Sequence, residues 1–342
     1  MKILVTGGAG FVGSNIVNHF IKQGHKVIAF DNLSRPGGGA SRNVGGLLAQ
    51  YGGNNQFEFI YGDVRDWGQV IEVMRGCEIV FHTAAQTAMT TSLINPTEDF
   101  EVNALGTLNI LEAARILNNQ PIIFYLSTNK VYGDLTKKEI KLIEQESRWE
   151  FGKETFNGIG EDYPLDYEGP YGCSKGIGDS YCLDYARTFG LKTVVFRMSG
   201  MYGVSQYPTE DQGWVGWFLR QSIEHKPITI YGDGKQVRDI LYISDLLRAF
   251  DMVLECKGDI YGQPFNLGGG RDNSISILEL LSFLTKELSI CPSSTQYADW
   301  RRADQKVYIS NIKKATDTFG WKPVVSKEEG IGKLYQWMKE GL

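Results

Sequence analysis

A tyrosine followed four positions later by a lysine could form a proton-transfer pair in this chain. Tyr171 and Lys175 have this spacing, directly after Gly169-Pro170. On a helix, side chains at positions i and i+4 lie on one face, so the lysine ammonium group would lie beside the phenol. A nearby positive charge lowers the pKa of a phenol below its usual value of about 10. The resulting phenolate could remove a proton from a substrate hydroxyl.

The same spacing also begins at Tyr231 and at Tyr335, so the surroundings must identify the functional pair. Tyr231 precedes a glycine-rich turn, and Tyr335 lies near the end of the chain on a predicted amphipathic helix. Tyr171 opens a predicted helix immediately after a Gly-Pro pair, which favours it as the catalytic tyrosine.

A hydroxyl group at the end of a predicted strand is the third candidate for catalysis. Residues 122–126 are apolar and predict a buried strand, which Ser127 and Thr128 follow. Thr128 would then hold a substrate oxygen while Tyr171 moves the proton. The alternative for Thr128 alone is a strand-end hydroxyl that bonds to the backbone, but the three groups together favour a catalytic role.

Glycine is unusually frequent, with 40 in 342 residues, and three glycines form a phosphate-binding pattern. Gly7, Gly10 and Gly13 follow a short apolar strand and precede a predicted helix. The first permits a tight turn, the second lets a pyrophosphate approach the backbone, and the third allows close helix packing. The amides at the helix start would face the anion. This arrangement predicts a dinucleotide site.

Acidic residues at the ends of the next two predicted strands extend this site. A carboxylate at Asp31 would accept hydrogen bonds from an adenosine ribose and repel a 2′-phosphate, which favours NAD over NADP. Arg35 lies four residues later, so exclusion of NADP stays open. Asp63 could either reach the adenine edge or act as a helix N-cap.

Short apolar runs that predict strands lie at 3–5, 27–30, 57–60, 79–81, 122–126 and 193–196. They alternate with helix-length segments such as 102–117 through the first 200 residues, and a further helix is predicted over 277–288. This alternation predicts an α/β fold with a Rossmann-type doubly wound parallel sheet. We expect an NAD-binding domain over 1–200 and a smaller α/β substrate lobe over 201–342, with interleaved segments. The polar stretch 134–169 is predicted to be an insertion, either functional or a solvated surface excursion.

Composition excludes several classes of protein. The formal net charge of −5 argues against a nucleic-acid partner, which usually requires a basic face. No stretch approaches the roughly 18 apolar residues of a membrane helix, so we expect no membrane contact. The five cysteines lack paired spacing and are typical of free thiols. The four histidines lack metal-ligand spacing, so no metal is expected. These features indicate a cytoplasmic protein.

Together, the glycines, Asp31, Thr128, Tyr171 and Lys175 resemble the extended short-chain dehydrogenase/reductase family, the nucleotide-sugar-modifying enzymes, over essentially the whole chain. The stretches 86–92, 127–135 and 211–218 are similar to the CDP-sugar 2-epimerase branch. The 4,6-dehydratase branch carries an Asp-Glu pair after the strand-end threonine, where this chain has Asn129-Lys130. A UDP-sugar 4-epimerase and a UDP-sugar decarboxylase remain open from the catalytic residues alone.

The resemblance implies NAD-dependent epimerisation at C2 of a CDP-hexose through a transient 2-keto sugar. NAD would be regenerated in each turnover. The catalytic residues would be Thr128, Tyr171 and Lys175, together with Asn129. It also implies a homodimer or homotetramer, paired through helices near 98–117 and 171–188.

The binding residues implied by the motifs and by the resemblance fall into two sets. Those expected at the cofactor are Gly7, Gly10, Phe11, Val12, Gly13, Asp31, Asn32, Ser34, Arg35, Asp63, Val64, Ala84, Ala85, Gln86, Asn103, Ser127, Tyr171, Lys175 and Met198. Those expected at the substrate are Gln86, Thr128, Asn129, Gly213, Val215, Tyr231, Gln236, Arg238, Arg301 and Asp304, with Arg302 as a weaker candidate. Arginine is expected at the diphosphate because it binds phosphate with paired hydrogen bonds, and Tyr231 is expected to pack on the base.

Overall fold

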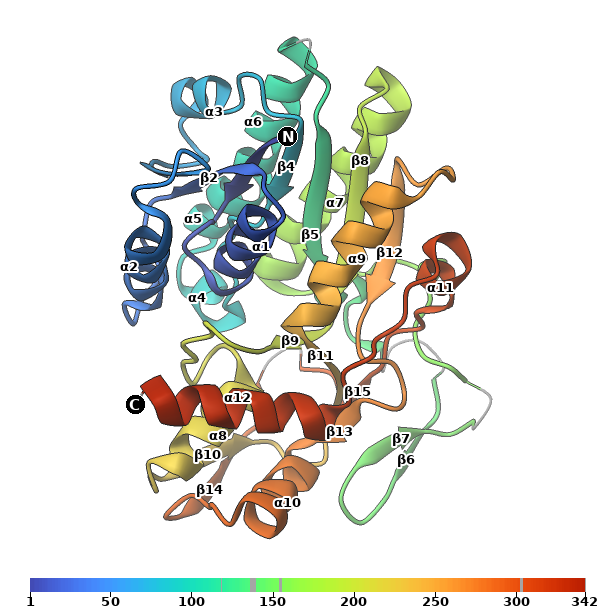
Figure 1. The fold of residues 1–342 in the computed structure, drawn as a ribbon. Helices are drawn as coiled ribbons and strands as arrows, with labels where there is room; N and C mark the ends of the chain where they lie inside the picture. The colour runs from blue at the N-terminus through green and yellow to red at the C-terminus, as the bar shows by residue number, and fades with distance from the viewer. Residues whose placement is uncertain (118, 136–139, 154–155, 302–303, 342) are drawn as a thin grey trace.

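The computed structural model describes residues 1–117, 119–135, 140–153, 156–301 and 304–341. Figure 1 shows a large sheet flanked by helices, with a smaller C-terminal part beneath it and the final helix, α12, running across that part.

The large sheet has seven strands in the order β12-β8-β5-β4-β1-β2-β3, and every neighbouring pair is parallel. The strands are β1 (Lys2–Thr6), β2 (Lys26–Asp31), β3 (Phe57–Tyr61), β4 (Ile79–His82), β5 (Ile122–Thr128), β8 (Thr193–Met198) and β12 (Gln263–Leu267). The sequence predicted the first six. It missed β12 because Pro264 and Asn266 interrupt the apolar run, and proline is tolerated on an edge strand such as this one.

Helices cover both faces of this sheet, as the two-sided apolar strands predicted. Along β1, Ile3 and Val5 point to one face and Leu4 to the other, as the pleat of a strand requires. The first face packs on α1 (Phe11–Lys22) and α9 (Ile243–Glu255). The other face packs on α3 (Trp67–Val73), α6 (Gly106–Ile116) and α7 (Gly169–Phe189). The predicted Rossmann-type α/β fold is therefore confirmed.

The order of the strands reverses between β1 and β4. In open parallel sheets the ligand crevice lies at the carboxyl ends of the strands where the order reverses. Thr6 at the end of β1, Asp31 at the end of β2 and Thr128 at the end of β5 all lie along this edge. The topology thus gathers residues from distant parts of the chain into one region.

The C-terminal part is built from two small sheets and three helices. One sheet contains β9 (Gly200–Tyr202), β11 (Val237–Tyr242), β13 (Ser274–Ser276) and β15 (Val307–Tyr308), and the other pairs β10 (Ile228–Tyr231) with β14 (Thr295–Ala298). The helices are α8 (Trp214–Ile223), α10 (Ile277–Leu288) and α12 (Lys327–Gly341). The predicted helix over 277–288 is found with these bounds.

Segments of the two parts interleave along the chain. Both β12 and α9 come from beyond residue 200, yet they belong to the large sheet and its covering layer (Figure 1). The ring of Phe250 on α9 lies 4.7 Å from the ring of Phe81 and 5.2 Å from that of Phe124, centre to centre. A short helix, α11 (Lys313–Phe319), packs on β12 through Phe319 and Phe265.

The predicted insertion over 134–169 contains a two-stranded antiparallel hairpin of β6 (Leu142–Glu144) and β7 (Trp149–Phe151). Its residues 136–139 and 154–155 lie outside the described residues. Leu135 and Ile159, at either side of the hairpin, are buried in one cluster with Val131, Tyr132 and Tyr308. This part of the insertion is therefore packed rather than a solvated excursion.

The helix expected over 102–117 is more complex than its apolar spacing indicated. It consists of α5 (Pro96–Phe100), a π-helical turn η1 (Glu101–Leu105) and α6, in unbroken succession. The helix that carries Tyr171 begins at Gly169 rather than at Tyr171. The remaining elements are α2 (Gly39–Tyr51), α4 (Met89–Ile94) and a 3-10 turn η2 (Asn129–Tyr132).

The five cysteines are all unpaired. Among the described residues, no helix combines the length and the apolar character needed to cross a bilayer.

Candidate functional site

Two cavities meet at the carboxyl edge of the large sheet. The first has a volume of about 290 Å³ and lies over the ends of β1, β2 and β4. The second has a volume of about 390 Å³ and lies between α7 and the C-terminal part. Thr87 and Gln212 line both cavities, and their side chains are hydrogen-bonded to each other. The two cavities therefore form one continuous site with a junction at this contact.

The first cavity collects most residues predicted for the cofactor. Its lining includes Gly7, Gly10, Phe11, Val12, Gly13, Asp31, Asn32, Ser34, Arg35, Asp63, Val64, Ala84, Ala85 and Gln86. The other predicted cofactor residues lie elsewhere. Tyr171 lines the second cavity, whereas Asn103, Ser127, Lys175 and Met198 are not among the described lining residues of either cavity.

The three glycines of the turn have different reasons to be glycine. Gly7 has a φ of +68°, and a Cβ there would lie 2.7 Å from the backbone nitrogen of Ala84. A Cβ on Gly13 would lie 2.1 Å from the carbonyl oxygen of Gly7, so Gly13 lets α1 pack against the turn itself. A Cβ on Gly10 would meet that oxygen at 3.1 Å and otherwise point into free space of the cavity. Gly10 is thus the position at which a ligand can approach the backbone.

The carboxylate of Asp31 is fixed by its own turn. One oxygen accepts a hydrogen bond from the amide of Ala9 at 3.0 Å and the other from the amide of Leu33 at 2.7 Å. Burial raises the pKa of Asp31, and these backbone hydrogen bonds act in the opposite direction. Each carboxylate oxygen can accept more than one hydrogen bond, so the side chain is oriented and still able to accept hydrogen bonds from a ribose.

Asp63 does not act as a helix N-cap. That role belongs to Asp66, whose side chain accepts a hydrogen bond from the amide of Gln69 at the start of α3. Asp63 accepts hydrogen bonds from the Arg65 guanidinium at 2.7 Å and from the Asn32 amide at 2.8 Å. Burial opposes the charge of Asp63, but these hydrogen bonds leave its pKa below its ordinary value. Asp63 and Asn32, which both line the first cavity, therefore form a linked polar pair.

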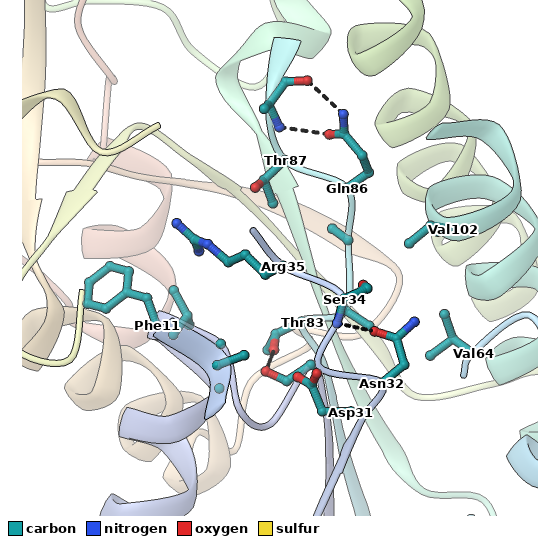
Figure 2. A pocket seen from close by; sticks show the side chains of 18 of the residues that line it. Phe11, Asp31, Asn32, Ser34, Arg35, Val64, Thr83, Gln86, Thr87 and Val102 are labelled. Atoms are coloured by element: carbon teal, nitrogen blue, oxygen red, sulfur yellow. Dashed lines mark hydrogen bonds between the residues drawn. The ribbon is translucent and has the colours of Figure 1, made fainter. Parts of the chain in front are cut away.

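Arg35 reaches into the first cavity (Figure 2). Burial lowers the pKa of its guanidinium. Figure 2 also shows that the side chain of Gln86 bonds to Ala88, with the amide of Ala88 donating to it at 2.7 Å and its own amide donating to the carbonyl of Ala88 at 2.8 Å. Gln86 lines the first cavity and not the second, so its predicted contact with the substrate is not seen.

Thr128 lies at the end of β5, and Tyr171 and Lys175 lie one helical turn apart on α7, which contacts β5. The Thr128 hydroxyl donates to the side-chain oxygen of Asn129 at 3.3 Å, and the ammonium nitrogen of Lys175 lies 4.3 Å from the centre of the Tyr125 ring. Lys175 is buried, and burial lowers its pKa to about 8, against the opposing effect of Asp179 and Asp99.

The expected lowering of the Tyr171 pKa is not produced by the chain itself. Burial raises the pKa of Tyr171 to about 12, and the hydrogen bond from Thr128 opposes this only in part. Within the chain alone, desolvation of the phenolate therefore dominates, and a lowered pKa at Tyr171 stays a prediction that requires a further positive charge beside the phenol, such as that of bound NAD⁺.

Several residues predicted for the site lie behind the cavity walls and do not line either cavity. Asn103, on the π-helical turn, accepts a hydrogen bond from the amide of Gln86 at 2.9 Å and donates one to its carbonyl at 3.0 Å. Ser127 donates to Asp179 at 2.8 Å beneath the catalytic strand. Val215 is 2% exposed, and its side chain packs in the buried cluster that joins one face of the large sheet to the C-terminal part, so its predicted contact with the substrate stays a prediction.

The second cavity contains the predicted substrate residues Asn129, Gly213, Tyr231, Gln236, Arg238, Arg301 and Asp304. Arg302 lies outside the described residues. Arg238 donates to Asp304 at 2.6 Å, and Lys130 lies 3.5 Å from the same carboxylate oxygen. Asp304 therefore holds two cations together at the wall of the cavity. Burial opposes its charge, yet the two cations keep its pKa below its ordinary value.

At another part of this cavity, the guanidinium of Arg301 covers the ring of Tyr231 at 4.1 Å. The Tyr231 hydroxyl donates to Glu210 at 3.1 Å, and Arg301 pairs with Asp211 at 3.2 Å. The two predicted phosphate-binding arginines thus already have acidic partners, and a diphosphate would share their remaining donors.

The sequence analysis missed other lining residues of the second cavity. They are Thr87, Met89, Thr90, Leu93, Lys130, Ser199, Gly200, Glu210, Asp211, Gln212, Trp214, Trp217, Phe218, Thr229 and Ile277. Many of them lie in the stretches 86–92 and 211–218, which carried the family resemblance. The unusual composition of those stretches was the available signal for a role in binding.

These residues fit a bound dinucleotide. At Gly10, only a residue without a Cβ leaves space for a ligand. The amides in the first turn of α1 have no acceptor within the helix. Asp31 lies at the end of β2, and both of its carboxylate oxygens are held in place by backbone amides. The phosphates would lie at the turn between β1 and α1, and the ribose at Asp31.

Comparisons with known proteins agree with this geometry. Residues 3–268 match the model of the NAD dependent epimerase/dehydratase family. The chain is 46% identical over 344 residues to CDP-paratose 2-epimerase of Salmonella typhi, covering 98% of this chain and 99% of that protein. It is 32% identical to a putative UDP-glucose 4-epimerase of Methanocaldococcus jannaschii, covering 98% of each. Among solved structures, UDP-glucuronic acid 4-epimerase of Bacillus cereus, in complex with UDP-glucuronic acid and NAD, superposes with a TM-score of 0.84 at 27% identity, covering 100% of each chain.

Replacing Gly10 with alanine should separate cofactor binding from folding. The new methyl group meets only the Gly7 oxygen at 3.1 Å and otherwise occupies the space into which the cofactor phosphates must fit. We expect Gly10→Ala to weaken NAD binding by about tenfold or more and to leave the melting temperature nearly unchanged. NAD released on denaturation, measured by absorbance, and thermal unfolding check this.

Gly45→Ala, in a helix position with no neighbour within 4 Å, is the matched control for the added methyl group. Gly13→Ala should instead destabilise the fold, because its Cβ would lie 2.1 Å from the Gly7 oxygen. Retention of bound NAD by Gly10→Ala at the wild-type level would contradict the assignment of this turn.

The buried Lys175 makes stability depend on pH. Its pKa is about 8 when folded and close to 10.5 when unfolded. Between these values the unfolded chain binds more protons, so this group's contribution to stability rises with pH from about 8 to 10.5 and is least favourable below pH 8. Lys175→Met removes that contribution. We therefore compare the free energy of unfolding of the variant minus that of the wild type at two pH values. This difference should be larger at about pH 7 than at about pH 10.5, by roughly 3 kcal/mol.

Urea unfolding of both proteins across this range measures the difference in the free energy of unfolding. Lys192→Met, at an exposed lysine next to β8, is the control and should show no such change. If the difference in the free energy of unfolding between the two proteins does not change with pH, then folding does not lower the pKa of Lys175.

Proposed function

The chain belongs to the NAD dependent epimerase/dehydratase family, and we propose that it inverts C2 of a CDP-hexose, converting CDP-paratose to CDP-tyvelose or acting on a related pair. It is an NAD-dependent nucleotide-sugar epimerase, and its substrate is a nucleotide-diphosphate sugar. The observation that carries the finer assignment is the 46% identity to a CDP-paratose 2-epimerase across 98% of the chain.

Tyr171 is the proposed proton carrier in this reaction. Its phenolic oxygen would remove the proton of the C2 hydroxyl as the sugar is oxidised, and would return it when the sugar is reduced. Thr128, at the end of β5, would hold the same sugar oxygen and keep the proton path short. NAD, when bound, accepts a hydride from the sugar carbon and gives it back, so it is regenerated in each turnover.

Lys175 and Asn129 would assist this step in different ways. The ammonium group of Lys175 favours the phenolate form of Tyr171 through its charge, and its burial keeps that charge unscreened by water. Asn129 lines the second cavity and donates a weak hydrogen bond to Gln305 at 3.3 Å. We infer that its amide contacts a sugar hydroxyl.

Inversion requires that the 2-keto sugar present its opposite face before it is reduced. The sugar must rotate while the nucleotide diphosphate stays fixed. Arg238 and Arg301 on the wall of the second cavity are the proposed anchors for the diphosphate, because arginine offers five donors and each is only partly engaged.

The acidic residues beside Tyr231 support cytosine over uracil. Glu210 accepts from the Tyr231 hydroxyl, and Asp211 lies beside it on the cavity wall. A carboxylate can accept a hydrogen bond from the exocyclic amine of cytosine, whereas uracil presents a carbonyl oxygen at the corresponding position. A base that packs near Tyr231 would therefore bind more favourably as cytosine.

A UDP-sugar 4-epimerase is the alternative. Its support is the 32% identity to a putative UDP-glucose 4-epimerase and the structural similarity to a UDP-glucuronic acid 4-epimerase. Thr128, Tyr171 and Lys175 would serve oxidation at C4 as well as at C2. The choice between the two therefore depends on how the second cavity orients the sugar.

A panel of nucleotide sugars tests the proposal. The purified enzyme, with no NAD added, is incubated with CDP-paratose, CDP-glucose, UDP-glucose and UDP-glucuronic acid, and the sugars are resolved by NMR. We expect inversion at C2 of a CDP-sugar. Inversion at C4 of a UDP-sugar, without C2 inversion of any CDP-sugar, would establish the alternative.

Tyr171→Phe is the control for chemistry in the same assay. Loss of the proton carrier should reduce turnover by about 100-fold or more, while NAD stays bound, because Tyr171 lines the second cavity and not the first. Wild-type turnover in this variant would contradict the role of Tyr171.

We further propose that the protein forms a dimer or a larger homo-oligomer through α7 and the helices beside it. Leu93, Ile94, Phe100, Leu105 and Tyr181 lie on α4, α5, the π-helical turn and α7, and between 37% and 85% of each is exposed. These elements contact one another, so the apolar residues belong to one side of the molecule. Apolar patches of this kind mark protein–protein contacts.

The mass in solution tests the assembly. Light scattering of the wild type at micromolar concentration should give at least twice the mass of 38.3 kDa. Phe100→Glu together with Tyr181→Glu should give a monomer with normal NAD content, because neither residue lines a cavity among those described. A monomeric wild type would contradict the proposal.

A further inference from the structure

The hairpin of β6 and β7 contacts two substrate-side loops from outside the site. Within the described ranges, no residue of this hairpin lines either cavity. The first loop, residues 231–238, runs from the last residue of β10 to the first two residues of β11 and carries Tyr231, Gln236 and Arg238. The second is residues 300–306, whose described part carries Arg301 and Asp304. The residue on the hairpin that touches both loops is Trp149.

Trp149 holds the first loop through hydrogen bonds. Its indole N–H donates to Asp233 at 2.8 Å, and its backbone N–H donates to the carbonyl of Lys235 at 2.9 Å. Asp233 in turn accepts from the amide of Lys235 at 2.8 Å, and the Lys235 ammonium group pairs with Glu144 on β6 at 2.8 Å. The tight turn of this loop is therefore fixed to the hairpin at three points.

The same indole ring holds the second loop through a cation. The ammonium nitrogen of Lys306 lies 3.8 Å from the centre of the Trp149 ring, a distance at which the ring face attracts a cation. The carbonyl of Lys306 accepts from the amide of Val237 at 2.8 Å, which joins the second loop to the first. In addition, Gly232 packs against Trp300, where a Cβ would lie 2.7 Å from the ring.

We propose that Trp149 is a positioning residue for the nucleotide diphosphate, which sets the separation of the two loops before the ligand binds. This inference rests on the proposed function, because it takes the second cavity as the nucleotide-sugar site. Arg238 lies on one loop and Arg301 on the other. The separation of the two loops must therefore stay fixed if both arginines are to reach one diphosphate. Fixing them in advance removes an ordering cost that binding would otherwise carry.

Two substitutions separate the contacts of Trp149. Trp149→Phe keeps an aromatic ring beneath Lys306 and removes the donor to Asp233, whereas Trp149→Leu removes both contacts. Dissociation constants for CDP and for UDP are measured by calorimetry on the NAD-loaded protein, alongside kcat, KM, NAD content and the melting temperature. Ile143→Ala, at a partly exposed position on β6 opposite Glu150, is the control on the same hairpin.

We expect Trp149→Phe to weaken binding of the preferred nucleotide about threefold to tenfold, the size of one hydrogen bond, and Trp149→Leu to weaken it further. KM should rise in parallel, kcat should stay within about twofold, and NAD content should not change. Ile143→Ala should bind the nucleotide as tightly as the wild type does, even if it lowers the melting temperature by as much as the Trp149 variants do.

Three results would overturn the assignment. The first is unchanged nucleotide binding in Trp149→Leu, and the second is a lower melting temperature with unchanged binding in both variants, which would mean that Trp149 only stabilises the fold. The third is equal loss of binding in Ile143→Ala.

A wild type that prefers UDP would refute the proposed function and leave the role of Trp149 to be judged on UDP. A wild type that binds neither nucleotide would refute both.

Discussion

The buried ion pair between Asp179 and Arg197 holds together the elements that carry the proposed catalytic residues. Both side chains are almost fully buried, and the guanidinium donates to the two carboxylate oxygens at 2.8 and 2.9 Å. Asp179 also accepts from Ser127, the residue before Thr128, and lies one helical turn after Lys175. Burying such a pair is costly, and removing one partner costs more, about 3–5 kcal/mol, because the other charge is left unpaired. The relative positions of β5, α7 and β8 therefore depend on a contact that does not itself touch the ligand cavities among the described residues.

A second consequence of burial concerns the protonation of the site. Desolvation raises the pKa of Tyr171 to about 12 and lowers that of Lys175 to about 8. Burial thus shifts both groups toward their neutral forms, although Lys175 with a pKa of about 8 stays mostly protonated near pH 7. The proposed proton transfer needs the phenolate of Tyr171, so a positive charge beside the phenol has to offset the desolvation.

Local patterns in the sequence were sufficient for six of the seven strands of the large sheet and for the glycine turn between β1 and α1. Gly10 and Gly13 act within this turn, and Asp31 was recognisable from its place at the end of an apolar run. Residues whose partners are distant in sequence were not predictable in this way. Asp63 was assigned as a possible cap because its bond to Asn32 cannot be seen from sequence. Val215 was placed at the substrate by its neighbours, but the phase of α8 turns it into the core. The depth at which Tyr171 is buried was not predictable either, because its spacing from Lys175 indicates a nearby lysine and not the distance of either group from water.

The interleaving of β12 has a consequence for how the protein can be made and divided. Its nearest sheet neighbour, β8, ends at Met198, and β12 begins at Gln263. During synthesis the seventh strand and the helix α9, whose Phe250 packs among Phe81, Phe124 and Phe196, emerge only after much of the C-terminal part. Non-local pairings of this kind slow folding because chain entropy is lost before the contacts form. A gene fragment that stops at residue 200 would lack one edge of the sheet and the aromatic cover of one face, so the large sheet can be completed only after residues through Leu267 have emerged from the ribosome.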